Sequence, residues 1–448
     1  MNENIDQTLH YIHNILSGFY LSSYSPKYYP SILDFYTHFL LLDYKKCLML
    51  SLPRMEQFRF FLTTIIAIYY MTFSMNIIHY TDTERFLLGD LTIIIIGESD
   101  NLIHNSALFA WSALTIGWLL VYDLFHTKRS NAYRTTIIYI NERDDDPNFA
   151  KKYKKLTKSS ILLFNFIHQI LPDSNRNFKQ FSNRFFCITQ IFHFIINLFI
   201  HFIRLDDFIH TRPLWQILIR AISIQMMCIV LNFLFSFYYS TLTYSAYILW
   251  LGLKTIKNIR KQIDTLLRKY QSNEMATEKI LKQSNIFIQL RLLKLFHVYT
   301  RIIISTEQIE SYASRMMLWA IFFTYITSQF TIHLINELKN DNIIIWISLY
   351  YILFLEHVVM FLLSYMISTY NYRLNSIQYD IRRTVIALNQ KSSNRFKIKM
   401  MIIYYYLVNL KTFGIKIGPI TVLNKIIFVK IIIYYARVTM LWQKLFGH

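Results

Sequence analysis

The residues with the most conspicuous chemistry are polar side chains, and one tryptophan, within long apolar runs. They are Asn197, His201, Arg220, Gln225, Gln329, His333, Trp346 and Glu356. Ionisable groups in such surroundings are costly and are often functional, so we predict a ligand-binding site among them. The alternative is interhelical hydrogen bonding that only supports packing. Glu356 and Arg220 would equally suit a structural ion pair.

The sequence lacks the residue groupings of an enzyme or a metal site. Cys47, Cys187 and Cys228 have neither metal-ligand spacing nor a paired framework. No apolar run contains a His-x-x-x-His pair or two neighbouring aspartates at its middle. We therefore expect no catalytic activity, no cofactor and no metal site.

The elements that must position these side chains are apolar segments long enough to cross a bilayer. A helix needs about 20 mostly apolar residues to cover roughly 30 Å of hydrocarbon. Seven segments meet this requirement, and prolines are absent from their middles. They are 58–79, 102–122, 185–203, 214–236, 314–335, 343–367 and 418–438. The predicted fold class is an all-α membrane protein with seven transmembrane helices.

The distribution of Lys and Arg predicts the orientation of these helices. The N-terminal segment holds four of them, and the loops after spans two, four and six hold twelve, eleven and nine, which makes thirty-six. The loops after spans one, three and five hold only four in total. Because Lys and Arg are enriched in cytoplasmic segments, the N-terminus is predicted to be cytoplasmic and the C-terminus extracellular. Anionic lipids of the inner leaflet explain the net charge of +20 better than nucleic acid does. We expect a multi-pass protein of the plasma membrane.

Several segments are predicted to lie on the cytoplasmic side. Residues 1–56 form an N-terminal segment with an amphipathic helix at 29–52, and residues 57–448 form the transmembrane domain. The apolar run 214–253 fits one long helix projecting into the cytoplasm. A hairpin near Ser236 would place eleven basic residues outside the cell and is rejected. Helical patterns in 254–311 and 368–412 indicate a packed cytoplasmic domain.

The C-terminal segment carries the most specific motif. It contains Gly418-Pro419, an isoleucine-rich run, and five residues, Val438 to Trp442, followed by Gln443. This resembles the C-terminal signature of arthropod gustatory receptors, a family of seven-span chemoreceptors with a cytoplasmic N-terminus. In that signature Thr-Tyr precedes the five apolar residues, and Gln-Phe follows them. Here Ala436-Arg437 replaces the Thr-Tyr pair and Lys444 replaces the Phe. Thr324-Tyr325 and Gln329-Phe330 repeat these letters with different spacing inside span five, which we interpret as coincidence.

The resemblance implies a tetrameric, ligand-gated, non-selective cation channel for taste or contact chemicals. Four copies of the last helix would surround the pore, with Gln443, Met440 and Val438 as pore residues. The expected partners are membrane lipids, a small-molecule tastant and either identical or related subunits. Lys430 and Arg437 share one helix face and would repel cations, so they turn away from the pore or a partner subunit is needed. The alternatives are an alternating-access transporter and a non-conducting scaffold.

Overall fold

The computed structural model describes residues 54–90, 111–123 except 113, 209–272, 278–337, 343–388, 393–409 and 414–446, with residues 133, 195 and 201. About 92% of the described residues are helical, which confirms the all-α prediction apart from one short hairpin. The amphipathic helix expected at 29–52 and most of spans two and three lie outside the described residues. The chain divides into two compact units. The first unit comprises Met1–His104 and Gln180–Ser240, and the second comprises Asn105–Lys179 and Thr241–His448.

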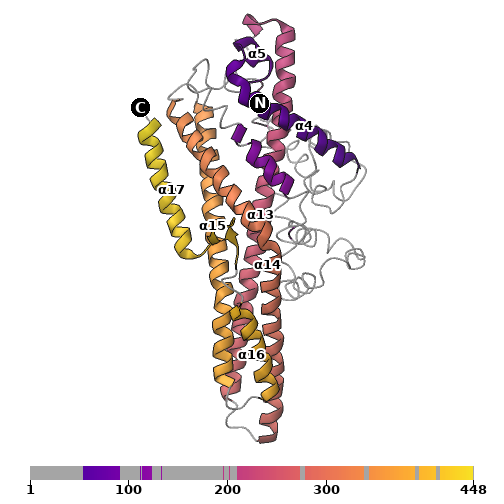
Figure 1. Ribbon diagram of the computed structural model, residues 1–448, viewed down its shortest axis with the longest axis vertical. Helices are drawn as coiled ribbons and strands as arrows, with labels where there is room; N and C mark the ends of the chain where they lie inside the picture. Colours follow the sequence, from indigo (N-terminus) through magenta and orange to yellow (C-terminus); the bar gives the residue numbers. More distant parts are fainter. Residues whose placement is uncertain are drawn as a thin grey trace, which may run out of the picture. The chain divides into compact units, whose positions relative to one another are not determined.

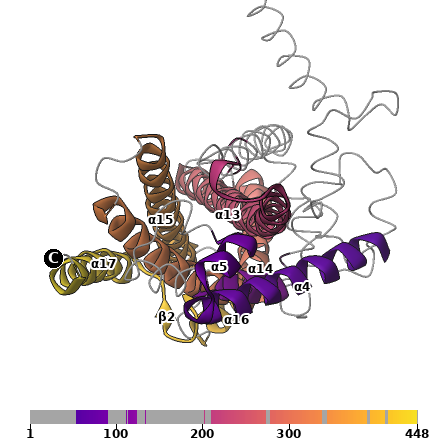
Figure 2. The ribbon, with the colours of Figure 1, turned by 90° about the horizontal axis from the view of Figure 1, so that it is seen from above.

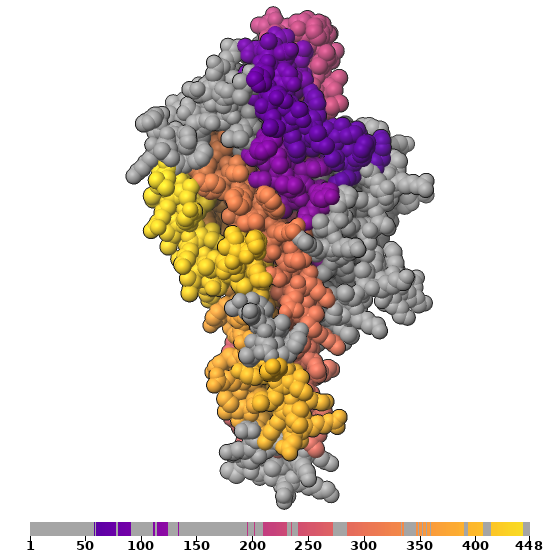
Figure 3. All heavy atoms as spheres, in the orientation of Figure 1, coloured from indigo at the N-terminus to yellow at the C-terminus, as the bar shows by residue number. Residues whose placement is uncertain are grey.

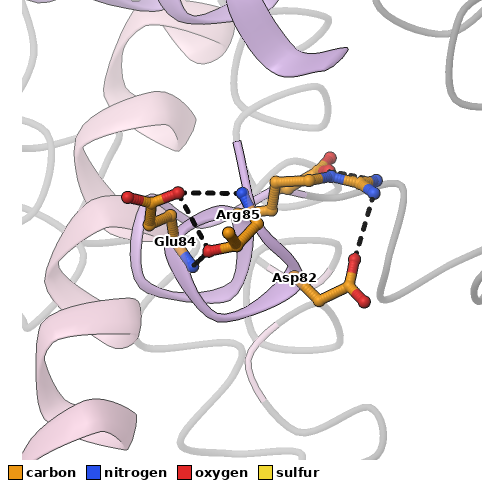
Figure 4. Close-up of polar contacts among 5 residues, drawn as sticks. Asp82, Glu84 and Arg85 are labelled. Carbon is orange, nitrogen blue, oxygen red and sulfur yellow. Dashed lines mark hydrogen bonds and ion pairs between the residues drawn. The ribbon is translucent and has the colours of Figure 1, made fainter. Parts of the chain in front are cut away.

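In the first unit, a short capped helix packs against the start of a long one. Helix α4 (Arg54–Asn76) and the 3₁₀ turn η1 (Ile77–His79) lead to α5 (Asp82–Leu87). Thr81 and Glu84 form a capping box, in which each side chain bonds the backbone N–H of the other residue. The Arg85 guanidinium lies 2.8 Å from the Asp90 carboxylate and 3.6 Å from that of Asp82 (Figure 4). These contacts order the loop that follows α4.

The end of α5 and helix α4 are both bonded to the third turn of α13 (Leu214–Ser272). The Ser223 hydroxyl donates to the Leu87 carbonyl at 2.9 Å, and the Tyr70 hydroxyl donates to the carbonyl of Ser223. Gly89 adopts φ +76°, and a Cβ there would approach the Ile224 nitrogen to 3.0 Å. Glycine is therefore required at this close approach.

The helix α13 is continuous over 59 residues and passes through Ser236 without a turn. This confirms the prediction of one long helix over 214–253. Pro213 precedes its first residue, and a proline is tolerated there because the first N–H groups of a helix have no intrahelical acceptor. At 1.5 Å per residue the helix is roughly 88 Å long, far more than one bilayer crossing requires.

The second unit is built on three long helices. Its part of α13 lies with α14 (Glu278–Glu337) and α15 (Ile343–Leu388), which pack along each other. Helix α16 (Asn394–Asn409) packs against the lower parts of α14 and α15 in Figure 1. The apolar core includes Ile259, Leu292, Phe296, Ile303, Leu374 and Ile381, all almost fully buried. The packed helical region predicted from 254–311 and 368–412 is confirmed, whereas its cytoplasmic location stays a prediction.

A charged network joins the same three helices within this packed region. The carboxylate of Asp380 is fully buried, with the Arg260 guanidinium 3.3 Å from Oδ1 and the Tyr299 hydroxyl 3.5 Å from Oδ2. Arg383 pairs with Asp264 beside it. Burial, and then the nearby Asp380 carboxylate, raise the pKa of Tyr299, so its hydroxyl stays a hydrogen-bond donor.

The segment predicted to open the last span is not helical. Strands β1 (Lys416–Ile417) and β2 (Thr421–Val422) form an antiparallel hairpin, with Gly418 at φ +53° in the turn. Helix α17 begins only at Lys425 and runs to Phe446. Residues 418–424 of the predicted span 418–438 are therefore not helical, and the crossing of a membrane by α17 stays a prediction. Gly418 and Pro419 suit a tight turn, and the Asn424 side chain caps α17 by accepting from the Ile427 N–H at 2.8 Å.

Candidate functional site

The candidate site is the junction where α17 meets α14 and α15, and Tyr435 on α17 is at its centre. The Tyr435 hydroxyl lies 2.7 Å from Ser328 Oγ on α14 and also contacts His357 Nε2 on α15. The rings of Tyr325 and Phe361 meet the Tyr435 ring edge to face, with centroids 6.1 and 6.0 Å away. One side chain thus joins three helices. Figure 2 shows α17 beside α15 when the molecule is seen from above.

The hydrogen bonds at this junction run from α15 through Tyr435 to α14. His357 Nδ1 lies 2.7 Å from the Leu353 carbonyl, which can only accept, so Nδ1 carries a proton. His357 Nε2 contacts the Tyr435 hydroxyl, which in turn lies 2.7 Å from Ser328 Oγ. The Ser328 hydroxyl also lies 3.0 Å from the Tyr325 carbonyl, so its single hydrogen serves either that carbonyl or Tyr435.

A second attachment lies one turn further along α17, where Thr439 is bonded by Gln329 of α14. Its Nε2 donates to Thr439 Oγ1 at 2.9 Å, and the Thr439 hydroxyl donates to the Tyr435 carbonyl at 3.0 Å. Gln329 is only 2% exposed, and its Oε1 has no hydrogen-bond partner among the residues that the structure describes. An unsatisfied buried acceptor costs about 1–3 kcal/mol. The amide therefore bonds α17 through its nitrogen, while its oxygen makes no hydrogen bond to the residues that the structure describes.

Glu356 lies next to His357 in the sequence but joins a different pair of helices. Its Oε2 accepts from Thr327 Oγ1 of α14 at 2.8 Å, and the residue is 6% exposed. Glu356 and His357 are adjacent on α15 but bond different helices. Glu356 ties α15 to α14, and His357 ties α15 to α17.

The structure brings together only some of the residues predicted as a ligand site. Gln329 and Glu356 both lie at this junction. Arg220 is in the first unit, with its guanidinium 4.8 Å from the centre of the Phe86 ring, and His201 pairs with Gln225 there at 3.2 Å. Trp346 is exposed and stacks edge to face on Tyr350. Asn197 and the side chain of His333 lie outside the described residues.

The predicted pore residues fall on different sides of α17. Met440 is 63% exposed, whereas Val438 is half-buried on the side that packs against the helices. Lys430 and Arg437 are exposed, like Met440. The helix includes Gln443, whose side chain lies outside the described residues, so its pore role stays a prediction.

Sequence reasoning missed Tyr435, Ser328, Thr439 and Thr327. Hydroxyl groups within apolar helices are a general signal of interhelical hydrogen bonds. That signal does not identify partners, because Tyr435 lies 107 residues from Ser328 and 78 from His357. Pairing depends on the rotation of each helix about its axis, and one sequence does not reveal that rotation.

The contacts at the junction are hydrogen bonds and edge-to-face ring contacts that join α17 to α14 and α15. Within the described parts of the chain, no three His, Cys, Asp or Glu residues are grouped to hold a metal ion. Neither the protein-family models nor the curated proteins include a match to this chain.

Proposed function

We propose that the protein is a gustatory-receptor-like, ligand-gated, non-selective cation channel of the plasma membrane. In this proposal the chain crosses the bilayer seven times from a cytoplasmic N-terminus. Four subunits surround a pore lined by α17, and a small-molecule tastant biases the open state. The support from sequence is the contrast of thirty-six basic residues with four across alternate loops, together with the C-terminal motif.

The observation that carries the proposal is the one-sided attachment of α17. Tyr435 and Thr439 bond side chains of α14 and α15, while the side chains on the opposite side of α17 are exposed. Figure 3 shows α17, in yellow, at the surface of the molecule. The exposed apolar side chains include Ile426, Val429, Ile433, Tyr434, Met440 and Leu441. A 22-residue helix is about 33 Å long, which matches roughly 30 Å of hydrocarbon. Such a helix needs lipid or neighbouring subunits on its outer side.

The other helices also expose apolar side chains. Those of α4 include Phe58, Phe61, Leu62, Ile65 and Ile68, and those of α15 include Ile347, Tyr350, Phe354 and Leu362. Exposing apolar surface to water costs about 25 cal/mol per Å², so lipid is the better surrounding for these faces. Among the described residues, one helix, Leu349–Leu388, is long and apolar enough to cross a membrane. Shorter apolar helices occupy Phe60–Asn76, Leu114–Asp123 and Leu214–Val230.

The junction gives the proposed gate a physical basis. Opening requires α17 to move relative to α14 and α15, and the bonds of Tyr435 and Gln329 resist that movement. Polar contacts of this kind are individually worth about 1 kcal/mol in a membrane, which a ligand can overcome by binding one state more tightly. A narrow apolar pore can then close by dewetting and open on a small rotation of α17.

Recording from purified protein in planar bilayers tests the proposal. With symmetrical NaCl and KCl solutions, and a panel of sugars and aromatic alkaloids, we expect unitary cation currents and particles with a fourfold axis. Stoichiometric uptake of a solute without currents would instead favour an alternating-access transporter. Protein that gives neither currents nor uptake would indicate a scaffold.

A further inference from the structure

The hairpin that precedes α17 is hydrogen-bonded to a single asparagine side chain of α15, Asn371. Asn371 Nδ2 donates to the carbonyl oxygens of both Ile415 and Leu423, each at 2.9 Å. Its Oδ1 accepts from the Ile415 N–H, also at 2.9 Å. The side chain is 1% exposed, and both N–H groups and the oxygen of its amide are in use. Asn371 therefore joins the two ends of the hairpin, which also bond each other through Leu423 N and the Ile415 carbonyl at 3.2 Å.

The opposite end of the hairpin is held by α14. The Gly418 N–H donates to the Ser314 carbonyl at 2.8 Å, and Lys416 Nζ lies 3.0 Å from a Glu310 carboxylate oxygen. A Cβ on Gly418 would come within 2.8 Å of Leu318 Cδ2. The hairpin thus contacts α15 at its base and α14 at its turn, and it lies against both helices.

The Asn371 hydrogen bonds are directly next to the start of α17. The Leu423 carbonyl accepts from Asn371, and the next residue, Asn424, caps α17 by accepting from the Ile427 N–H. No residue separates the carbonyl that Asn371 holds from the residue that caps the helix. A shift of α15 relative to α14 must therefore displace the first turn of α17 or break bonds that are buried from water.

We propose that Asn371 is a positioning residue that sets where α17 leaves the helix bundle and conveys rearrangement of α14 and α15 to α17. Its effect on current rests on the proposed channel function, while its effect on the hairpin does not. The side chain acts on the backbone of the linker and touches neither ion nor ligand.

The test variant is Asn371→Asp, because it keeps the size of the side chain and an acceptor for Ile415 N–H but removes both amide N–H donors. The carbonyls of Ile415 and Leu423 then have at most one donor between them, the O–H of a protonated carboxyl group, in place of two. Asn375→Asp is the control, since Asn375 lies one turn further along α15, is exposed, and has an Nδ2 that donates to the Asn371 carbonyl at 2.9 Å. If Asn371→Asp does not fold, Gly414→Ala replaces it. That substitution places a Cβ 2.6 Å from Asn371 Oδ1 at a residue with φ +140°.

The first measurement is hydrogen–deuterium exchange of the full chain in lipid nanodiscs. We expect residues 414–424 to exchange at least tenfold faster in Asn371→Asp, with α14 and the rest of α15 unchanged and Asn375→Asp like the parent. Unchanged exchange in the hairpin would overturn the proposal. Equal acceleration throughout α14 and α15 would also overturn it, because Asn371 would then be a general packing residue.

The second measurement is the open probability without ligand in planar bilayers. We expect Asn371→Asp to change it at least threefold while leaving the unitary conductance unchanged, because the pore itself is intact. Faster hairpin exchange with an unchanged open probability would overturn the role in gating. Absence of current in the parent protein would overturn the channel function, and the exchange measurement would still decide whether Asn371 sets the hairpin.

Discussion

At the scale of residues, Tyr435 shows how one hydroxyl group can decide where a helix lies. It bonds Ser328 of α14 and His357 of α15, whereas its neighbour Tyr434 is exposed. The two residues are of the same type and follow each other in the sequence, so the residue type does not explain the difference. Their roles differ because consecutive helical positions point about 100° apart.

Replacing Tyr435 by Phe should destabilise the protein by about 1–2 kcal/mol, because Ser328 and His357 each lose a buried partner. Thermal unfolding of the purified protein measures this loss. Tyr434→Phe is the matched control and should leave the unfolding temperature unchanged. Equal effects of the two substitutions would show that the junction does not hold α17.

A second prediction at this scale concerns Glu84 and acid. Its carboxylate accepts from the Thr81 N–H at 2.8 Å and from the Thr81 hydroxyl at 2.9 Å, which lowers the pKa of the Glu84 carboxyl. A lowered pKa means that this contribution to stability is full above the ordinary Glu value of about 4.3 and is lost as pH falls through the lowered value. Relative to the intrinsic exchange rate at each pH, amide exchange in α5 should therefore accelerate below about pH 4.

The control for acid is Glu84→Gln, which keeps the acceptor of the capping box but does not titrate. Its α5 exchange should lack the added acceleration at low pH. An identical acid response in Glu84→Gln and the parent would assign the effect to another group.

At the scale of elements, the three-helix bundle depends on a charge network as well as on apolar packing. The buried carboxylate of Asp380 faces Arg260 of α13 and Tyr299 of α14, so α15 is bonded to both neighbouring helices at one level. The Arg383–Asp264 pair lies beside it and is about one-third exposed. Removing one partner of a buried pair is costly because the remaining charge stays desolvated.

We predict that Asp380→Asn lowers the free energy of unfolding by roughly 2–3 kcal/mol, since Arg260 loses its carboxylate within the bundle. The exposed pair supplies the comparison, and Asp264→Asn should cost less than about 1 kcal/mol. Denaturant unfolding in detergent, followed by helical circular dichroism, measures both. If Asp264→Asn lowered the free energy of unfolding more than Asp380→Asn does, Asp380 would not be the central residue of the network.

At the scale of the whole molecule, the proposed assembly places the outer side of α17 against lipid or other subunits. Lys430 and Arg437 are exposed there among apolar side chains. Positive charges near a cation pathway repel the conducted ions. Their presence therefore bears directly on how much current the proposed assembly carries.

Replacing Arg437 by Gln should raise the unitary cation conductance at least twofold, because a positive charge close to the proposed pore is removed. Single-channel recording at low ionic strength gives the largest effect, since salt screens the charge. Lys425→Gln is the control, as Lys425 lies over the Tyr372 ring at the start of α17 and should leave conductance unchanged. A conductance insensitive to Arg437 would place this side of α17 away from the ions.

The membrane topology has its own test on intact cells. An epitope tag at residue 1 should be protected from antibodies, whereas a tag inserted at residue 340, in the predicted outer loop between spans five and six, should bind them. Permeabilisation should expose the first tag and serves as the control. Antibody binding at residue 1 on intact cells would reverse the predicted orientation and remove the support for a gustatory-receptor-like protein.

The sequence by itself determined the helical class, the continuity of α13 and the packed helices over 254–311 and 368–412, because these follow from apolar runs and helical periodicity along the chain. It also singled out Gln329 and Glu356 as buried polar groups. Only the tertiary structure decided that Tyr435 meets Ser328 and His357, and that Asn371 grips a hairpin where a helix was expected. Those contacts depend on the rotation and axial offset of helices far apart in sequence, which local patterns do not encode.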